Sequence, residues 1–450
     1  LKTQNVTAYS AALPTIWMKE TQEIRKRFLH SLKLGTGETY LLQKKYPEID
    51  FLREIVKGAV QNFTYDSQSE GSRSKYIYGL IKKSKSKDKI ISKVFDKIIE
   101  TKEDDWGLYQ LLDIAVLIYK DGNTSALEII KTRFEKNGLD GFDFCGQEQL
   151  MEIGGIDGVL KVAEIVGERL TNDKDDYEDS WKIDEFQKKN KSIDVYGILK
   201  EKSKKNEFIK AYYESIIQNK FKPYRRVKPI KFSYELIKEK IQADKFRYIS
   251  KTRANDLSEE EVLKLAEEFI KSRKNKEKEN YLRFFAKRKF PYDYQILFKI
   301  AQRKNPRKTR LVEYAVESLT FFKDKKIREL AVKKIKEVKN PCDYLPLLVS
   351  NYQKGDFELL KGVIDRSNNF DFIHSLINGI LDIYKSSSLK ECKEPLEAMY
   401  SKMNCGLHRI DIVELLYENK VLSNKILLEL QFDSDESIRK LYRTIKKNGR

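Results

Sequence analysis

The stretch Asn305–Val338, NPRKTRLVEYAVESLTFFKDKKIRELAVKKIKEV, contains two apolar stripes of the same shape, one after the other. The first stripe consists of Leu311, Tyr314, Ala315, Leu319 and Phe322, and the second of Ile327, Leu330, Ala331, Ile335 and Val338. These spacings have the period of an amphipathic helix, so the stretch predicts two helices joined by a turn of about four residues. Pro306 suits the first turn of the leading helix, and Asp324 suits the N-cap of the second.

A helix hairpin cannot bury its apolar stripe alone, so neighbours of the same kind are expected. A second copy of the motif lies at the end of the chain, at an offset of 111 residues. Leu319, Phe321, Asp324, Ile327, Arg328 and Leu330 match Leu430, Phe432, Asp435, Ile438, Arg439 and Leu441. The motif resembles the HEAT-repeat family of α-solenoids; a chance match of two helices is the alternative. The resemblance implies an all-α, right-handed superhelix of HEAT-like hairpins with a concave face, and it carries no catalytic residue.

The composition agrees with an all-α chain. Only 9 Pro and 20 Gly are available to make turns in 450 residues, and Lys, Glu, Leu and Ile are abundant. The sequence has no apolar run long enough to span a membrane and no secretory signal pattern near its start. The four cysteines are Cys145, Cys342, Cys392 and Cys405. They are scattered, as expected of reduced thiols in a cytoplasmic protein.

Stripes of helical period recur along the rest of the chain. They predict helix hairpins at 23–46 and 106–134, and helices at 51–60, 73–82, 90–99 and 156–170. The turn of the first hairpin, Gly35-Thr36-Gly37, could be taken for a phosphate-binding loop. It lacks the preceding strand and the Gly-Lys-Ser/Thr signature, so a glycine that ends one helix before the next begins is the better interpretation.

Four segments are expected. Residues 1–17 precede the first methionine, Met18, and are expected to be an extension or a tail. Residues 18–170 form an N-terminal block of helical repeats, 171–191 an acidic linker, and 192–450 a C-terminal block. The acidic residues of the linker lack the glycine and the ligand spacing of a calcium loop, so a solvated surface loop is expected there.

The net charge is concentrated in one part of the chain. Residues 201–310 contain 32 Lys and Arg against 15 Asp and Glu, which accounts for +17 of the total of +19. Cations alternate with aromatic residues at 221–232 and 281–294, and five more cations follow at 303–310. Cations can neutralise phosphates and aromatic rings can stack on bases, so this segment predicts nucleic-acid binding. The alternative is that the aromatic residues form the core and the cations cover the solvated backs of the helices. The candidate contacts are Lys222, Arg225, Arg226, Lys228, Arg283, Lys287, Arg288, Lys289, Arg303, Lys304, Arg307 and Lys308.

Catalytic and metal-binding patterns are scarce. The chain has three histidines, His30, His374 and His408, and no local arrangement of a nucleophile beside a base. Cys405 and His408, with Cys392 and His374 upstream, supply the ligand types of a zinc site. Their spacings match no familiar zinc pattern. We therefore expect no metal and no cofactor, and nothing indicates a small-molecule ligand.

One class of enzymes shares the expected architecture. The DNA alkylation-repair glycosylases resemble HEAT-like solenoids whose basic concave face holds DNA beside Trp and Asp residues. In this chain Trp106 follows Asp104-Asp105, and Trp181 lies near Asp179 and Asp184. Neither arrangement aligns with that family's active site, and both tryptophans lie outside the basic segment.

The sequence thus predicts a cytoplasmic, non-enzymatic scaffold that holds a protein or a nucleic acid on its concave face. A DNA-binding repair enzyme is the alternative. A structural subunit of a larger bacterial-type complex, such as a defence system, is a third possibility that no motif supports.

Overall fold

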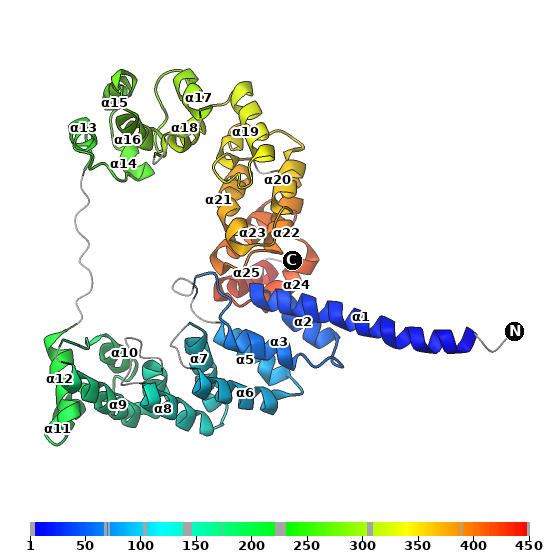
Figure 1. The fold of residues 1–450 in the computed structure, drawn as a ribbon, viewed down its shortest axis with the longest axis vertical. Helices are drawn as coiled ribbons and strands as arrows, with labels where there is room; N and C mark the ends of the chain where they lie inside the picture. The colour runs from blue at the N-terminus through cyan, green and yellow to red at the C-terminus, as the bar shows by residue number, and fades with distance from the viewer. Residues whose placement is uncertain are drawn as a thin grey trace. The chain divides into compact units, whose positions relative to one another are not determined.

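The computed structural model describes residues 5–66, 70, 73–101, 106–137, 146–173, 175–220, 231–303, 309–387 and 389–447 (Figure 1). Helix makes up 72% of the structure, and the described ranges contain no strand, which confirms the all-α prediction. None of the helices in these ranges combines the length and the apolarity needed to cross a bilayer.

The chain forms two compact units. The first consists of residues 1–225, 404–407 and 424–450, and the second of residues 226–403 and 408–423. The acidic segment 171–191, expected to link two blocks, lies inside the first unit. The first unit therefore contains both the N-terminal half of the chain and its C-terminal end.

The first unit is a set of helices, of which those between α1 and α12 surround one apolar core. Its helices are α1 (Asn5–Leu34), α2 (Glu38–Lys45), α3 (Leu52–Val60), α5 (Ser74–Lys83), α6 (Lys87–Glu100), α7 (Trp106–Lys120), α8 (Ser125–Asn137), α9 (Gln147–Asn172), α10 (Trp181–Lys189), α11 (Val195–Ser203), α12 (Glu207–Gln218), α24 (Asn424–Leu430) and α25 (Glu436–Lys447). The predicted hairpins at 23–46 and 106–134 are confirmed as α1–α2 and α7–α8. The core runs without a break from Ile24 to Ile216.

Two helices of this unit begin well before their predicted starts. α1 begins at Asn5, so most of the segment expected to be an extension is continuous with the first predicted helix. α9 begins at Gln147 rather than at residue 156, and it is kinked at Gly155, whose φ is 57° and ψ −135°. Glycine tolerates this positive φ at no steric cost, which explains how the chain can change direction there between two helical parts.

The Gly35-Thr36-Gly37 turn ends α1 and receives the C-terminal end of the chain. Gly35 has a φ of +79°, as expected of a glycine that ends a helix, and its carbonyl accepts a hydrogen bond of 2.8 Å from the backbone N–H of Ser434. A Cβ on Gly37 would lie 1.9 Å from the backbone oxygen of Glu429. The turn is therefore a packing surface for α24 and α25, and the interpretation as a helix-ending glycine is confirmed.

The second unit is a succession of shorter helices. These are α13 (Tyr234–Gln242), α14 (Lys251–Asn255), α15 (Glu259–Lys271), α16 (Asn275–Phe285), α17 (Gln295–Ala301), α18 (Leu311–Leu319), α19 (Lys325–Glu337), the 3₁₀ turn η1 (Leu345–Leu348), α20 (Asp356–Ile364), α21 (Phe370–Ser387), the 3₁₀ turn η2 (Lys390–Cys392), α22 (Lys393–Tyr400) and α23 (Gly406–Glu418), whose part from His408 belongs here. Consecutive helices pack as hairpins, for example α15 with α16 and α17 with α18.

The stretch that first indicated the fold forms α18 and α19. Asp324 caps α19 as predicted, since its carboxylate accepts a hydrogen bond of 2.8 Å from the backbone N–H of Lys326. α18 begins only at Leu311, and Pro306 lies outside the described residues. Phe322, predicted on the first stripe, lies in the turn instead.

The second copy of the motif forms α24 and α25 with the same local structure. The carboxylate of Asp435 accepts a hydrogen bond of 2.7 Å from the backbone N–H of Ser437, in the first turn of α25. The two arginines of the motif differ in their partners. Arg328 binds the carboxylate of Asp356 in the next helix, whereas Arg439 donates to the carbonyl of Asp433 in its own turn.

Candidate nucleic-acid interface

The described part of the basic segment in the second unit contains α13 to α17 and the loop 243–250 between α13 and α14. Asp244 ends α13 in the left-handed region, with a φ of 52°. Phe246 and Ile249 then turn into the core, each 1% exposed. Arg247 and Tyr248, between them, are exposed. The local pattern of buried and exposed residues thus anchors the loop while presenting two side chains to solvent.

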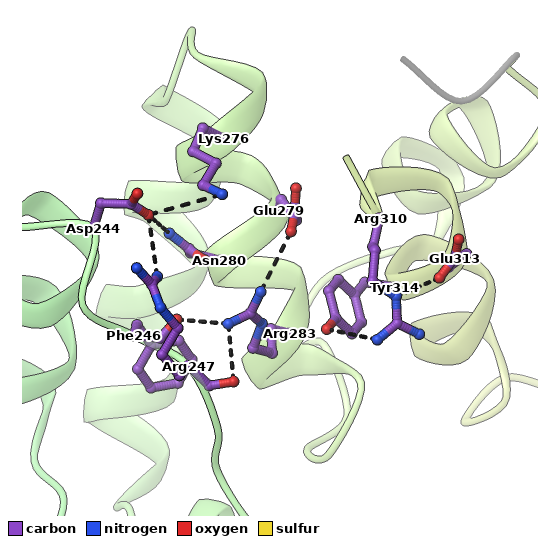
Figure 2. Close-up of polar contacts among 10 residues, drawn as sticks. All are labelled: Asp244, Phe246, Arg247, Lys276, Glu279, Asn280, Arg283, Arg310, Glu313 and Tyr314. Carbon is purple, nitrogen blue, oxygen red and sulfur yellow. Dashed lines mark hydrogen bonds and ion pairs between the residues drawn. The ribbon is translucent and has the colours of Figure 1, made fainter. Parts of the chain in front are cut away.

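Arg283, on α16, fixes this loop (Figure 2). Its guanidinium donates hydrogen bonds of 2.6 Å to the carbonyl of Phe246 and 2.9 Å to the carbonyl of Arg247. It also pairs with the buried Glu279, at 3.3 Å. The side chain of Arg283 is only 14% exposed. Its donors are therefore turned toward the protein, and it acts on the surface through the loop that it holds.

A second set of contacts ties the start of the loop to α16. Asp244 accepts from the amide of Asn280 at 3.5 Å and lies 4.0 Å from the ammonium of Lys276 and 3.4 Å from the guanidinium of Arg247 (Figure 2). Desolvation raises the pKa of Asp244, but the amide and the two cations outweigh it and hold that pKa below its ordinary value. The carboxylate therefore stays ionised and keeps the turn closed at neutral pH.

Tyr314, on α18, connects the same cluster to the next hairpin. The guanidinium carbon of Arg283 lies 5.3 Å from the centre of the Tyr314 ring, and that of Arg310 lies 4.9 Å from it. Arg310 also donates to the phenol oxygen of Tyr314 at 3.2 Å and pairs with Glu313 (Figure 2). Cations within about 6 Å of a ring face are attracted by it. The loop, α16 and α18 are thus joined by one set of polar contacts.

A basic pocket of about 540 Å³ lies between α14 and the residues that follow α16. Its lining consists of Lys251, Asn255, Glu259, Lys287, Arg288, Lys289, Phe290, Pro291 and Phe321. Four of these residues are cations and one is an acid, so the pocket favours an anion. Aromatic rings and a proline complete its wall.

The cations of the pocket differ in their partners. Arg288 pairs with Glu259 and donates to the side-chain oxygen of Asn255 at 3.1 Å. The ammonium of Lys287 lies 3.5 Å from the carboxylate of Glu317. Lys289 lies over the ring of Phe322, 5.3 Å from its centre. These are partly exposed contacts, which an incoming phosphate can replace at small cost.

The structure describes five of the twelve predicted contact residues. Lys287, Arg288 and Lys289 share the pocket, Arg283 holds the loop, and Arg303 is exposed after α17. Lys222, Arg225, Arg226, Lys228, Lys304, Arg307 and Lys308 lie outside the described residues.

Lys251 and the exposed loop residues Lys245, Arg247 and Tyr248 were not among the predicted contacts. The run Lys-Phe-Arg-Tyr at 245–248 interleaves cations with aromatic residues, as the two chosen stretches do, and that signal could have found them. Lys251 carries no such signal, because only the fold brings α14 beside residues 287–289.

Most aromatic residues of the stretch 281–294 belong to the core. Phe284, Phe285 and Phe290 are buried and pack edge to face, with ring centres 5.2 Å apart for the first two and 4.9 Å apart for Phe285 and Phe290. Tyr292 is the exposed ring of this stretch. The alternative weighed for the sequence therefore holds for these phenylalanines, while the cations beside them line the pocket.

The two tryptophans singled out by the sequence are both exposed, and both belong to the first unit. Trp181 lines a pocket of about 350 Å³ together with Glu148, Glu152, Glu185, Lys182, Lys189, Asn190 and the apolar Met151 and Phe186. Glu148 and Glu152 are exposed carboxylates. Asp104 and Asp105, which precede Trp106 in the sequence, lie outside the described residues.

The acidic segment 171–191 is partly helical and partly buried, in contrast to the solvated loop that was expected. Glu178 is buried; its carboxylate lies 3.4 Å from the ammonium of Lys182 and 3.9 Å from the guanidinium of Arg169. Burial raises the pKa of Glu178, and Lys182 and Arg169 oppose that rise. Asp184 accepts hydrogen bonds from the hydroxyls of Ser180 and Tyr196, each 2.7 Å long. These carboxylates stabilise the start of α10.

Three of the residues considered as zinc ligands, His374, Cys392 and His408, lie in the second unit. The rings of His374 and His408 pack edge to face in the second unit, with centres 4.5 Å apart. Burial, and then the neighbouring His374, lower the pKa of His408, so its imidazole is neutral at physiological pH. Cys392 is fully buried, and burial raises the pKa of its thiol to about 11. It behaves as a small core residue.

Comparisons with protein-family models, with curated proteins and with solved structures found no match to this chain.

Proposed function

We propose that this chain is a non-enzymatic scaffold of HEAT-like helix hairpins that binds nucleic acid through its basic segment. The observation that carries the proposal is the pocket in which Lys251, Lys287, Arg288 and Lys289 converge from two separate parts of the chain around one acid, Glu259. Folding thus brings some of the cations of the basic segment together in one local cluster. Such a cluster can neutralise a phosphate backbone.

The hairpin architecture is supported by the two copies of the motif. In both, an Asp caps the second helix, at Asp324 and at Asp435. The bidentate pair of Arg328 with Asp356 joins one hairpin to the next, which suits a stack of similar units. A stack of this kind offers an extended surface for a polymer rather than a closed site for chemistry.

The test is binding of labelled DNA and RNA by fluorescence anisotropy. The variant reverses the charge of Lys251, Lys287, Arg288 and Lys289 to Glu. The control variant reverses Lys325, Lys326, Lys333 and Lys336, four exposed lysines of α19 outside the basic segment. Both change the net charge equally, so only the place of the charge differs.

The pocket variant should lose binding, and the α19 variant should keep most of it. Raising the salt concentration from about 50 to about 200 mM should weaken binding on the order of 100-fold if four phosphates are engaged. If both variants bind as the unchanged protein does, or if neither nucleic acid binds at low salt, the proposal is wrong. A protein with an acidic surface would then be the partner to seek.

The second candidate function, a DNA-repair enzyme resembling alkylation-repair glycosylases, has one observation in its favour. Trp181 lines a pocket of about 350 Å³ that also contains Glu148 and Glu152. A ring and a carboxylate in a pocket of that size are what base release from DNA would use. The assay is release of an alkylated base from DNA; activity that Glu148→Gln and Trp181→Ala both abolish would favour this function over the scaffold.

A further inference from the structure

The loop 243–250 presents a single aromatic ring to solvent. The ring of Tyr248 is 71% exposed. The residues next to the exposed pair, Phe246 and Ile249, are both buried. Single exposed aromatic side chains are common on protein surfaces. What distinguishes Tyr248 is its place in a loop that is anchored on both sides of the exposed pair by buried residues.

The backbone that carries this ring is fixed before any ligand arrives. Arg283 binds the carbonyls of Phe246 and Arg247, the two residues directly before Tyr248 (Figure 2). Asn280 and Lys276 hold Asp244 at the start of the loop. A preformed loop does not have to be ordered on binding, so more of the contact energy appears as affinity.

Cations flank Tyr248 along the chain. Lys245, Arg247 and Lys251 all lie within three residues of Tyr248 and are all exposed. Arg247 pairs with Asp244 at 3.4 Å, and both side chains of that pair are more than half exposed. An ion pair this exposed contributes little to stability, so the guanidinium of Arg247 can turn to a phosphate instead.

We propose that Tyr248 is a stacking platform for an unpaired base, and that the nucleic acid bound by this unit is single-stranded. In a duplex each base face is covered by its neighbours, so an exposed ring can stack only on an unpaired base or a strand end. Single strands offer free base faces and a flexible backbone that nearby cations can follow. This inference rests on the proposed function and names the form of nucleic acid that the basic surface takes.

The experiment compares the binding of three labelled probes to the full chain: a single-stranded DNA, a single-stranded RNA and a duplex DNA of equal length. Tyr248→Ala removes the ring, and Tyr248→Phe keeps it. Tyr177→Ala is the matched control, since Tyr177 is 66% exposed and lies in the acidic segment of the first unit. None of these exposed side chains supports the core, and thermal unfolding of each variant confirms that it folds.

Tyr248→Ala should weaken single-strand binding roughly 5- to 150-fold, the loss expected for about 1–3 kcal/mol of stacking on one base. Tyr248→Phe and Tyr177→Ala should change it less than about 2-fold, and duplex binding should be the weakest and insensitive to all three. If the duplex binds as well as the single strands, or if Tyr248→Ala binds normally, the stacking inference is overturned while the proposed function stands. If none of the probes binds, both fail.

Discussion

The guanidinium of Arg328 makes two parallel hydrogen bonds to the carboxylate of Asp356, 2.6 and 2.7 Å long. This pair joins α19 to the first turn of α20, and Arg328 also donates to the carbonyl of Asn351 between them, at 3.0 Å. Bidentate pairs of this kind fix the orientation of two elements as well as their distance. Arg328, one of the motif residues that suggested a repeat architecture, thus fixes α20 against α19.

Arg328→Ala should destabilise the second unit by about 2–3 kcal/mol, because Asp356 would remain as a largely buried carboxylate without its cation. Denaturation in urea measures this loss. Lys325→Ala is the control, since the ammonium of Lys325 lies 4.0 Å from Glu329 on the exposed face of the same helix. It should cost less than about 0.5 kcal/mol. Equal losses in the two variants would show that the pair is not needed.

Gly37→Ala should destabilise the first unit by about 1–3 kcal/mol, because the added Cβ would lie 1.9 Å from the backbone oxygen of Glu429 and would force α24 away from the turn. The φ of Gly37 is −71°, so the loss would come from contact rather than from backbone strain. Gly362→Ala is the matched control, since nothing lies within 4 Å of its Cβ position in α20. That change should stabilise by about 0.5–1 kcal/mol. Thermal unfolding of both variants decides the matter.

Glu178 and Asp324 should contribute to stability with opposite pH dependence. Burial raises the pKa of Glu178, so its contribution is greatest below the ordinary glutamate pKa and falls as the pH rises through the raised value. Hydrogen bonds, first from Tyr294 and then from the backbone of Lys326, lower the pKa of Asp324. Its contribution is present above the ordinary aspartate pKa and is lost as the pH falls through the lowered value.

The measurement is the free energy of unfolding in urea between about pH 3 and pH 8. Glu178→Gln should become more stable relative to the unchanged protein as the pH rises. Asp324→Asn should become less stable relative to the unchanged protein as the pH rises through the acid range. Two difference curves with the same sign of slope would contradict the assignment.

Much of this fold follows from local sequence patterns. The apolar period identified α18, α19, α7 and α8 because each helix must bury one stripe, and Asp324 was identifiable as a cap because a side-chain oxygen there meets free backbone N–H groups. The kink at Gly155 was not predicted, since the apolar pattern placed the start of this helix at residue 156 and the helical turns from Gln147 onward were missed. Contacts between distant parts of the chain, such as Ser434 with Gly35, leave no local periodicity at all.

The candidate site was less predictable than the fold. Composition identified a basic segment, but it could not tell a cation that faces a ligand from one that faces the protein. Arg283 and Arg288 look alike in sequence, yet the first is 14% exposed and holds a loop, while the second lines a pocket. The difference depends on which carbonyls the fold brings within reach of each guanidinium, and here these are the carbonyls of Phe246 and Arg247.

Arg283→Ala should loosen the loop 243–250 selectively. The change removes two hydrogen bonds to backbone carbonyls, the pair with Glu279 and the contact with the Tyr314 ring. Hydrogen bonds to charged groups contribute about 1.5–3 kcal/mol, so the unit should lose stability of that order. Amide hydrogen exchange should speed up at Arg247 and Tyr248, while the interior of α18 keeps its protection.

Arg288→Ala is the control, because Arg288 pairs with the exposed Glu259 and donates to the side chain of Asn255, outside the loop. It should cost less than about 1 kcal/mol and leave exchange in the loop unchanged. If the two variants give the same exchange pattern, Arg283 does not hold the loop, and the rigidity on which stacking by Tyr248 depends must come from elsewhere.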